Sequence, residues 1–71
     1  MSTKNEIKTA IARSISHTEI VHVDVDDMEE AYLAVSVEAD NCDRHTEDDG
    51  SLDVWGTTEH SSDFRLRLRK A

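Results

Sequence analysis

The sequence predicts an α+β fold in which two helices pack on one face of a small, mostly antiparallel three-stranded sheet. Two observations predict it. First, two segments have apolar residues at helical spacing, and between them lies a segment in which every second residue is apolar. Second, two more segments with alternating apolar residues follow. The chain has 71 residues, of which 37% are hydrophobic, so it is expected to close one modest core. Residues 1–71 are therefore expected to form a single domain in the order helix, strand, helix, strand, strand, without a large enzyme cleft.

The first element is predicted as a helix from about Thr3 to Ser16. Thr3 and Glu6 have the spacing of a capping box, in which the two side chains satisfy free backbone N–H groups at the helix start. Four apolar residues then recur at intervals of three and four, which places them on one helical face. They are Ile7, Ala10, Ile11 and Ile15.

The next element, Ile20–Val25, is predicted as a strand. Its three valines fall on one face of an extended chain, whereas His22 and Asp24 fall on the other. The valine face is expected to meet the helices.

A second helix is predicted over Met28–Ala39. Asp27 and Glu30 repeat the capping-box spacing, and five further residues fall within an arc of about 100°. Those five are Met28, Ala31, Tyr32, Val35 and Ala39. A strand stays the alternative, because alternate residues from Leu33 onward are apolar and β-branched residues favour strands. If the segment is a helix, Leu33 and Val37 lie off the buried arc and must cover something else.

The remaining chain is predicted as a long loop followed by two strands. Residues 40–51 are polar and acidic and contain Gly50, as loops do. Alternation predicts strands at residues 51–57 and 63–69, and residues 58–62 suit a hairpin connection. The chain contains no proline, no internal repeat and no linker long enough to divide it.

The outer face of the predicted sheet combines charged and aromatic residues. The apolar residues of the last strand are expected to face the helices, which sends Arg65, Arg67 and Arg69 outward, beside Asp53 and Trp55 of the preceding strand. One interpretation is that the arginines neutralise neighbouring acids and shield Trp55 through cross-strand pairs. A second makes Trp55, Arg65 and Arg67 a partner-binding site, since Trp and Arg are frequent interface hot spots. A stacking platform for nucleic-acid bases is disfavoured by the net charge of −8.

Charge is segregated along the chain. From Glu19 to Asp63 there are fifteen acidic residues and one basic residue, Arg44, which gives this acidic block a net charge of −14. The first eighteen residues carry +2 and the last eight carry +4. This balance disfavours direct binding to nucleic acid or to an anionic membrane and favours a basic partner. Because repulsion within the block destabilises a compact state, the block is expected to have a function.

The sequence shows no strong catalytic, metal-binding or cofactor-binding pattern. His22, Asp24, Asp26 and Asp27 resemble a hard-cation site, but they lack the ligand order of an EF-hand, and helix capping and solvation explain the aspartates. Cys42 has no second cysteine for a zinc site, and neighbouring carboxylates are expected to make it a poor nucleophile. We therefore expect a protein that is not an enzyme and that has no metal and no cofactor.

An acidic surface on a rigid scaffold imitates the phosphates of a nucleic acid. Proteins that bind a duplex line their channels with Lys and Arg, so such a surface would occupy the channel and exclude the nucleic acid, with fast, salt-sensitive association. The predicted partner-binding residues are the acids of the region 24–49. They are Asp24, Asp26, Asp27, Glu29, Glu30, Glu38, Asp40, Asp43, Glu47, Asp48 and Asp49.

Several segments resemble the small acidic phage-encoded anti-CRISPR proteins. They are D-D-M-E-E at residues 26–30, E-D-D-G at 47–50, and D-V-W-G at 53–56 ahead of D-F-R-L-R-L-R at 63–69. The resemblance is one of type across the whole chain, since the group shares no common fold or motif. It implies an inhibitor in the host cytoplasm that blocks the DNA- or RNA-binding groove of a Cas protein or effector complex. Cys42 and the basic C-terminal strand are not features of the group.

Three other functions stay open. The acids are also typical of a halophilic protein, of an antitoxin-like inhibitor of another basic protein, and of a self-associating module whose arginine strand pairs with the acidic block of a second copy. The protein is expected to be a monomer or a weak homodimer. One cysteine and the absence of a long apolar run favour a soluble, cytoplasmic protein that is not inserted in a membrane.

Overall fold

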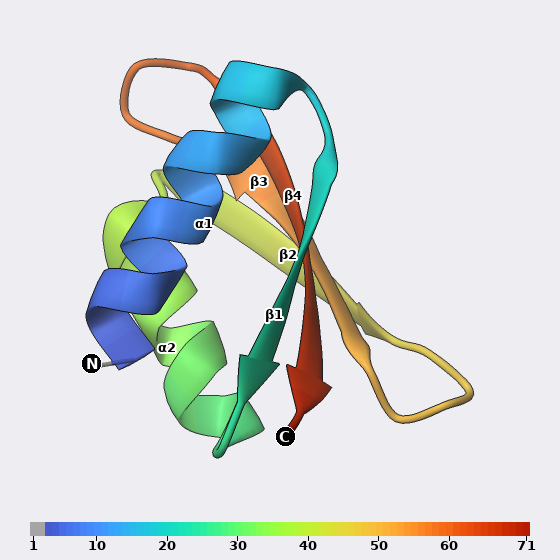
Figure 1. Ribbon diagram of the computed structural model, residues 1–71. Coiled ribbons are helices and arrows are strands. Elements are labelled where there is room, and N and C mark those ends of the chain that lie inside the picture. Colours follow the sequence, from blue (N-terminus) through green and yellow to red (C-terminus); the bar gives the residue numbers. More distant parts are fainter. Residues whose placement is uncertain (1–2) are drawn as a thin grey trace.

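The computed structural model describes residues 3–71 as two helices and a four-stranded mixed sheet (Figure 1). The helices are α1 (Thr3–His17) and α2 (Met28–Glu38). The strands are β1 (Ile20–Val25), β2 (Asn41–Thr46), β3 (Leu52–Thr57) and β4 (Asp63–Lys70). Their order across the sheet is β1-β4-β3-β2, in which β1 and β4 are parallel and the other two pairings are antiparallel.

The prediction of three strands is wrong, because β2 lies where the sequence predicts a loop. Five of its six residues are exposed, so the edge strand NCDRHT carries no alternation of apolar and polar residues. Pairing with β3 determines its position instead, with Cys42 opposite Gly56. A Cβ atom at Gly56 would overlap the carbonyl oxygen of Asn41 and lie 2.8 Å from Cys42 Cα. Glycine at this position therefore allows β2 to approach β3 closely.

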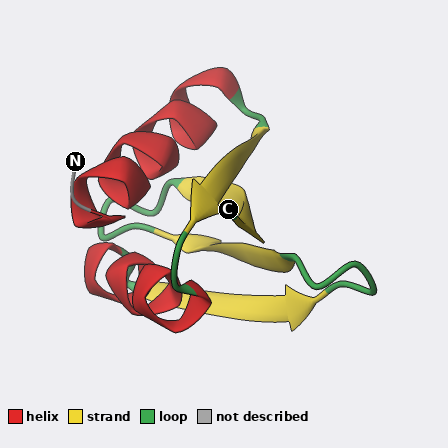
Figure 2. Cartoon of the chain, turned by 60° about the horizontal axis from the view of Figure 1, so that its bottom comes forward, coloured by secondary structure: helices red, strands yellow, loops and turns green. Residues whose placement is uncertain are grey.

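The second helix is confirmed, and the alternative strand is not. The side chain of Asp27 accepts a hydrogen bond from the Glu30 backbone N–H at 3.1 Å, as the capping spacing predicts. The helix ends at Glu38, where Ala39 becomes extended and its N–H donates to the Val35 carbonyl oxygen at 2.9 Å. Both helices lie on the same face of the sheet, as predicted (Figure 2).

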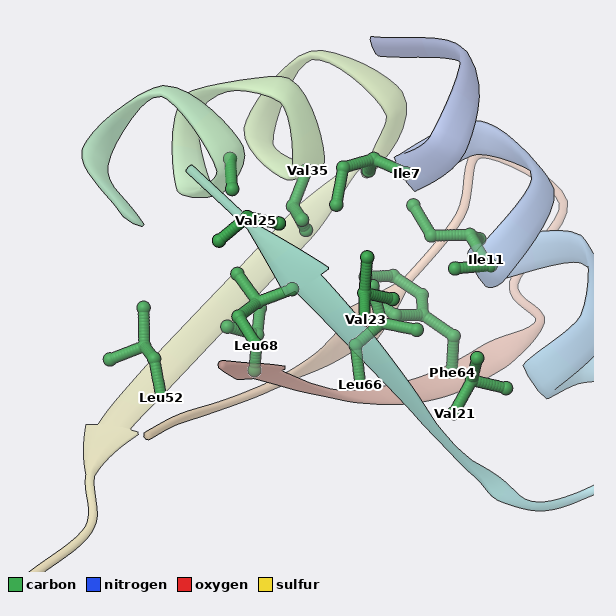
Figure 3. Close-up of a cluster of buried hydrophobic side chains, with 13 residues drawn as sticks. Ile7, Ile11, Val21, Val23, Val25, Val35, Leu52, Phe64, Leu66 and Leu68 are labelled. Carbon is green, nitrogen blue, oxygen red and sulfur yellow. The ribbon is translucent and has the colours of Figure 1, made fainter. Parts of the chain in front are cut away.

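The core fills the space between that face of the sheet and the two helices (Figure 3). The predicted alternation is confirmed in β1, where the valines are the buried residues, and in the first six residues of β4. In β3 it is broken, because Asp53 is buried between Leu52 and Val54. The buried apolar residues are Ile7, Ala10, Ile11, Val21, Val23, Val25, Ala31, Val35, Leu52, Val54, Phe64, Leu66 and Leu68. Leu66 and Leu68 lie opposite Val21 and Val23, so the parallel pair β1–β4 forms the centre of the core.

A buried serine fixes the C-terminal half of α1 to the sheet. Ser14 Oγ accepts a hydrogen bond from the Arg65 backbone N–H at 2.9 Å, and its hydroxyl donates to the Glu19 carbonyl oxygen at 2.8 Å. Ser14 is 3% exposed, so these bonds satisfy a hydroxyl group that is buried.

Candidate protein-docking surface

The predicted acidic residues lie most densely where β1 ends and α2 begins. We call this cluster the acidic corner: Asp24, Asp26, Asp27, Glu29 and Glu30. All five residues are exposed. Local structure explains the placement, since Asp24 takes an outward position on β1 and Asp27 is the N-cap of α2. Glu29 and Glu30 lie in the first turn of α2, where the helix dipole favours carboxylates.

Within residues 3–71, a single member of the acidic corner has an ion pair. Arg44 Nη1 lies 3.4 Å from Glu29 Oε1, and the same guanidinium lies 4.4 Å from the centre of the Tyr32 ring. A basic residue also borders the corner on the sheet, because Arg69 of β4 is the register partner of Asp24. The corner is therefore anionic, with cations on two sides and its other carboxylates without an ionic partner in the described chain.

The other predicted acids lie elsewhere. Glu38 and Asp40 lie at the far end of α2, roughly 16 Å from its start at 1.5 Å per residue. Asp43 lies on β2 opposite Trp55, and residues 47–49 form the hairpin between β2 and β3. Because β1 and β2 are opposite edges of the sheet, the hairpin and Asp24 are separated by two strands, whereas Glu29 on α2 contacts Arg44 of β2, three residues before Glu47. The predicted set is thus divided among the corner, the far end of α2, β2 and the hairpin.

Two of the hairpin acids have structural partners. The Oδ1 atom of Asp49 accepts hydrogen bonds from the Ser51 backbone N–H at 2.9 Å and from its hydroxyl at 2.6 Å. The hydroxyl bond is the main reason that the pKa of Asp49 lies below its usual value. Glu47 Oε1 lies 3.7 Å from Arg67 Nη2. These contacts within the chain give Asp49 and Glu47 a structural role that requires no binding partner.

The open face of the sheet holds the second predicted site. The side chain of Asp53 is 4% exposed and accepts two hydrogen bonds from Arg65. Arg65 Nε donates to Oδ1 at 3.1 Å, and Arg65 Nη2 donates to Oδ2 at 2.5 Å. The hydrogen bond from Arg65 is the main cause of the lowered pKa of Asp53. Arg67 Nη2 also approaches Asp53 Oδ2, at 4.0 Å. The expected neutralisation of acids by these arginines is confirmed for Asp53 and Glu47, while Trp55 stays 38% exposed.

Most of the acidic block has no such neutralisation. Among the described residues, ten of its fifteen carboxylates have no arginine, lysine or histidine nitrogen within 4.0 Å. They are Asp24, Asp26, Asp27, Glu30, Glu38, Asp40, Asp43, Asp48, Asp49 and Asp63. This charge faces solvent or a partner.

Cys42 packs between β2 and α2. Its Sγ atom lies 3.6 Å from Tyr32 Oη and 3.7 Å from Ser36 Oγ. The hydrogen bond with Cys42 is the main cause of the raised pKa of Tyr32. In residues 3–71 no group of three or more His, Cys, Asp or Glu side chains is placed to share a metal ion. The contacts of Cys42 are therefore those of a side chain that fills the space beside an edge strand.

The chain matches no protein-family model, and searches of curated proteins and of solved structures find no match. In the part of the chain that the structure describes, neither helix is long and apolar enough to cross a membrane. The acidic corner and the open face of the sheet correspond to the two partner-binding sites predicted from the sequence. Among the described residues, Asp53 and Glu47 on the open face have ionic partners and Asp43, opposite Trp55, has none, whereas in the corner Glu29 alone has one.

Proposed function

We propose that the protein is a non-enzymatic inhibitor whose acidic corner docks on a basic nucleic-acid-binding surface of another protein and excludes the nucleic acid. One observation carries the proposal: within residues 3–71, four exposed carboxylates of the corner have no cationic partner although they are neighbours in the chain. They are Asp24, Asp26, Asp27 and Glu30. Repulsion among neighbouring like charges opposes folding, and a cationic partner relieves it.

The scaffold supports fast and specific docking. The corner joins a strand paired along its length with β4 to a capped helix, so its backbone is fixed before a partner arrives. Fixed charges lose little conformational freedom on binding and steer a cationic partner over long distances. Both effects weaken as salt screens the charges.

Cas effector complexes are the first targets to test, because the resemblance to anti-CRISPR proteins implies them. An antitoxin-like inhibitor would use the same corner on a different basic protein. The two roles share the chemistry of the binding surface and differ in the identity of the target.

A second candidate is adaptation to concentrated salt, favoured by the unpaired acids outside the corner, such as Glu38, Asp40 and Asp48. In that case the charge serves solvation and no partner is required. The free energy of unfolding in urea would then keep rising up to molar KCl. Simple screening of repulsion instead saturates at lower salt, since the Debye length is already about 8 Å at physiological ionic strength.

The test is a binding titration against candidate nucleoprotein complexes at two ionic strengths. The quadruple variant D26N/D27N/E29Q/E30Q keeps a capping residue at position 27 and removes four charges of the corner. We expect association to be at least about tenfold slower and inhibition to be lost, because electrostatic steering raises association rates roughly 10- to 1000-fold.

The matched control removes four exposed charges that lie outside both α2 and the corner, as D43N/D48N/E59Q/D63N. It has the same net charge and leaves the acidic corner intact. Inhibition should survive in this variant and thermal unfolding should be similar in both. Equal loss of inhibition in the two variants would show that inhibition depends on net charge and not on the acidic corner. Retained inhibition in the corner variant would indicate that the partner binds the sheet face that carries Trp55.

A further inference from the structure

The outward side of α2 carries two exposed apolar residues that the fold does not use. Leu33 is 61% exposed and Val37 is 69% exposed, the largest values among the exposed large hydrophobic residues described. They are four residues apart, so they lie side by side on one helical face. As the spacing predicts for a helix, both lie off the buried arc.

The buried side of α2 is complete without them. Ala31 and Val35 are fully buried, and Met28 and Tyr32 pack against the same core. Val37 is a β-branched residue at an exposed helix position, where its intrinsic helix propensity is below that of Lys, Gln or Glu. The core therefore explains neither residue of the apolar pair, and helix propensity does not explain Val37.

The charges around the pair indicate what covers it. Residues 28–39 contain no Lys, Arg or His. Glu29 and Glu30 lie one turn before Leu33, and Glu38 and Asp40 follow Val37. A partner that buries the pair would meet carboxylates at both ends, so it needs apolar groups in the middle and cations on either side.

A second copy of the same chain does not meet this need through α2. Two α2 helices packed on each other through their apolar pairs would bring the carboxylates of both copies together. Neither α2 segment contains Lys, Arg or His, and Arg44 of β2, which pairs with Glu29, offsets one carboxylate in each copy. A cationic partner has the opposite, favourable interaction.

We propose that Leu33 and Val37 form the apolar anchor of an interaction surface on α2, and that its occupant is a cationic amphipathic surface of another protein. The inference rests on the proposed function and deepens it: the target site presents apolar side chains between Lys and Arg. The carboxylates steer and orient the partner, and the apolar pair supplies contacts that salt does not screen.

The test uses two labelled helical peptides of lysine and leucine with the same composition. In the first, the leucines lie on one face; in the second, the order is scrambled so that they do not. We expect the protein to bind the first peptide at least about tenfold more tightly, since burial of an aliphatic anchor of this size corresponds to one power of ten or more.

The variant L33Q/V37Q removes the anchor with residues that favour helix. It should lose the preference for the amphipathic peptide and keep its affinity for the scrambled one. The variant I20T, which removes an apolar residue that is 40% exposed on β1, should keep the preference. Thermal unfolding of each variant shows that the fold is intact.

Other outcomes separate the two proposals. Equal affinity of the native protein for both peptides, or an unchanged preference in L33Q/V37Q, overturns the anchor. Native affinity of D26N/D27N/E29Q/E30Q for the scrambled peptide overturns the acidic corner as a docking site. A native dimer that L33Q/V37Q dissociates in sedimentation identifies a second copy as the occupant and overturns the cationic partner.

Discussion

Asp53 and Arg65 form a two-pronged ion pair across β3 and β4, although neither is the register partner of the other. The register places Asp53 opposite Arg67 and Trp55 opposite Arg65. Arg65 nevertheless extends diagonally and engages both carboxylate oxygens, at 3.1 and 2.5 Å. The pair lies on the face of the sheet without helices, so long polar side chains cover the strands there.

The variant D53N is expected to be less stable than the native protein by about 1–3 kcal/mol, because the Arg65 guanidinium loses a charged bidentate acceptor on a buried side chain. Urea denaturation measures this loss. The control D63N removes an exposed acid that has no ion pair among the described residues, and should change stability by less than about 0.5 kcal/mol. Equal losses in the two variants would contradict the role of the pair.

The contribution of Asp53 should depend on pH. Arg65 holds the pKa of Asp53 below its usual value in the folded protein. Its stabilisation is therefore complete above the unfolded pKa, about 3.9, and is lost as the pH falls through the folded pKa. The stability difference between the native protein and D53N should shrink between about pH 5 and about pH 2. A difference that stays constant over that range would contradict this assignment.

The variant G56A should destabilise the β2 edge of the sheet. The new Cβ would overlap the Asn41 carbonyl oxygen, so β2 must move, at a cost of about 1–3 kcal/mol. Hydrogen exchange should then accelerate at the amides of β2 more than at those of β1. The control G50A has open space but a φ of +88°, so it should cost about 1 kcal/mol without this local pattern.

The variant R44Q should strengthen the acidic corner. Arg44 is the cation paired with Glu29, so its removal makes the corner more negative and should speed association with a lysine peptide in stopped-flow measurements. Stability should fall by no more than about 1 kcal/mol, since the pair is exposed. The control R13Q gives the same net charge but frees Glu19, at the other end of β1. An equal gain in R13Q would attribute the effect to net charge.

Sequence patterns predicted the helices and strands that bury one face, and they missed β2, which is mostly exposed. Apolar and polar residues alternate in β1 and β4 because one side of each strand meets the core. Asp27 indicates the start of α2, because its side chain caps that helix. Five of the six residues of β2 are exposed and Cys42 is half-buried, so its sequence has no alternation of apolar and polar residues, and its position depends on pairing with β3. The parallel pairing of β1 with β4 is also invisible to alternation, which shows faces but not neighbours.

The same limit applies to the candidate site. The density of acids at residues 24–30 follows from the sequence, and so does the outward direction of Arg65 and Arg67. The contact between Arg44 and Glu29 does not, because it requires β2 to be a strand beside α2. The placement of Asp24 and the hairpin acids at opposite edges of the sheet likewise requires the strand order.

The place of β4 between β1 and β3 has a consequence for synthesis of the chain. Until Asp63–Lys70 leaves the ribosome, β1 has no partner and its valine face has no second strand to complete it. The distant β1–β4 pairing must therefore form after all other elements have been synthesised, and it is expected to limit the rate of folding.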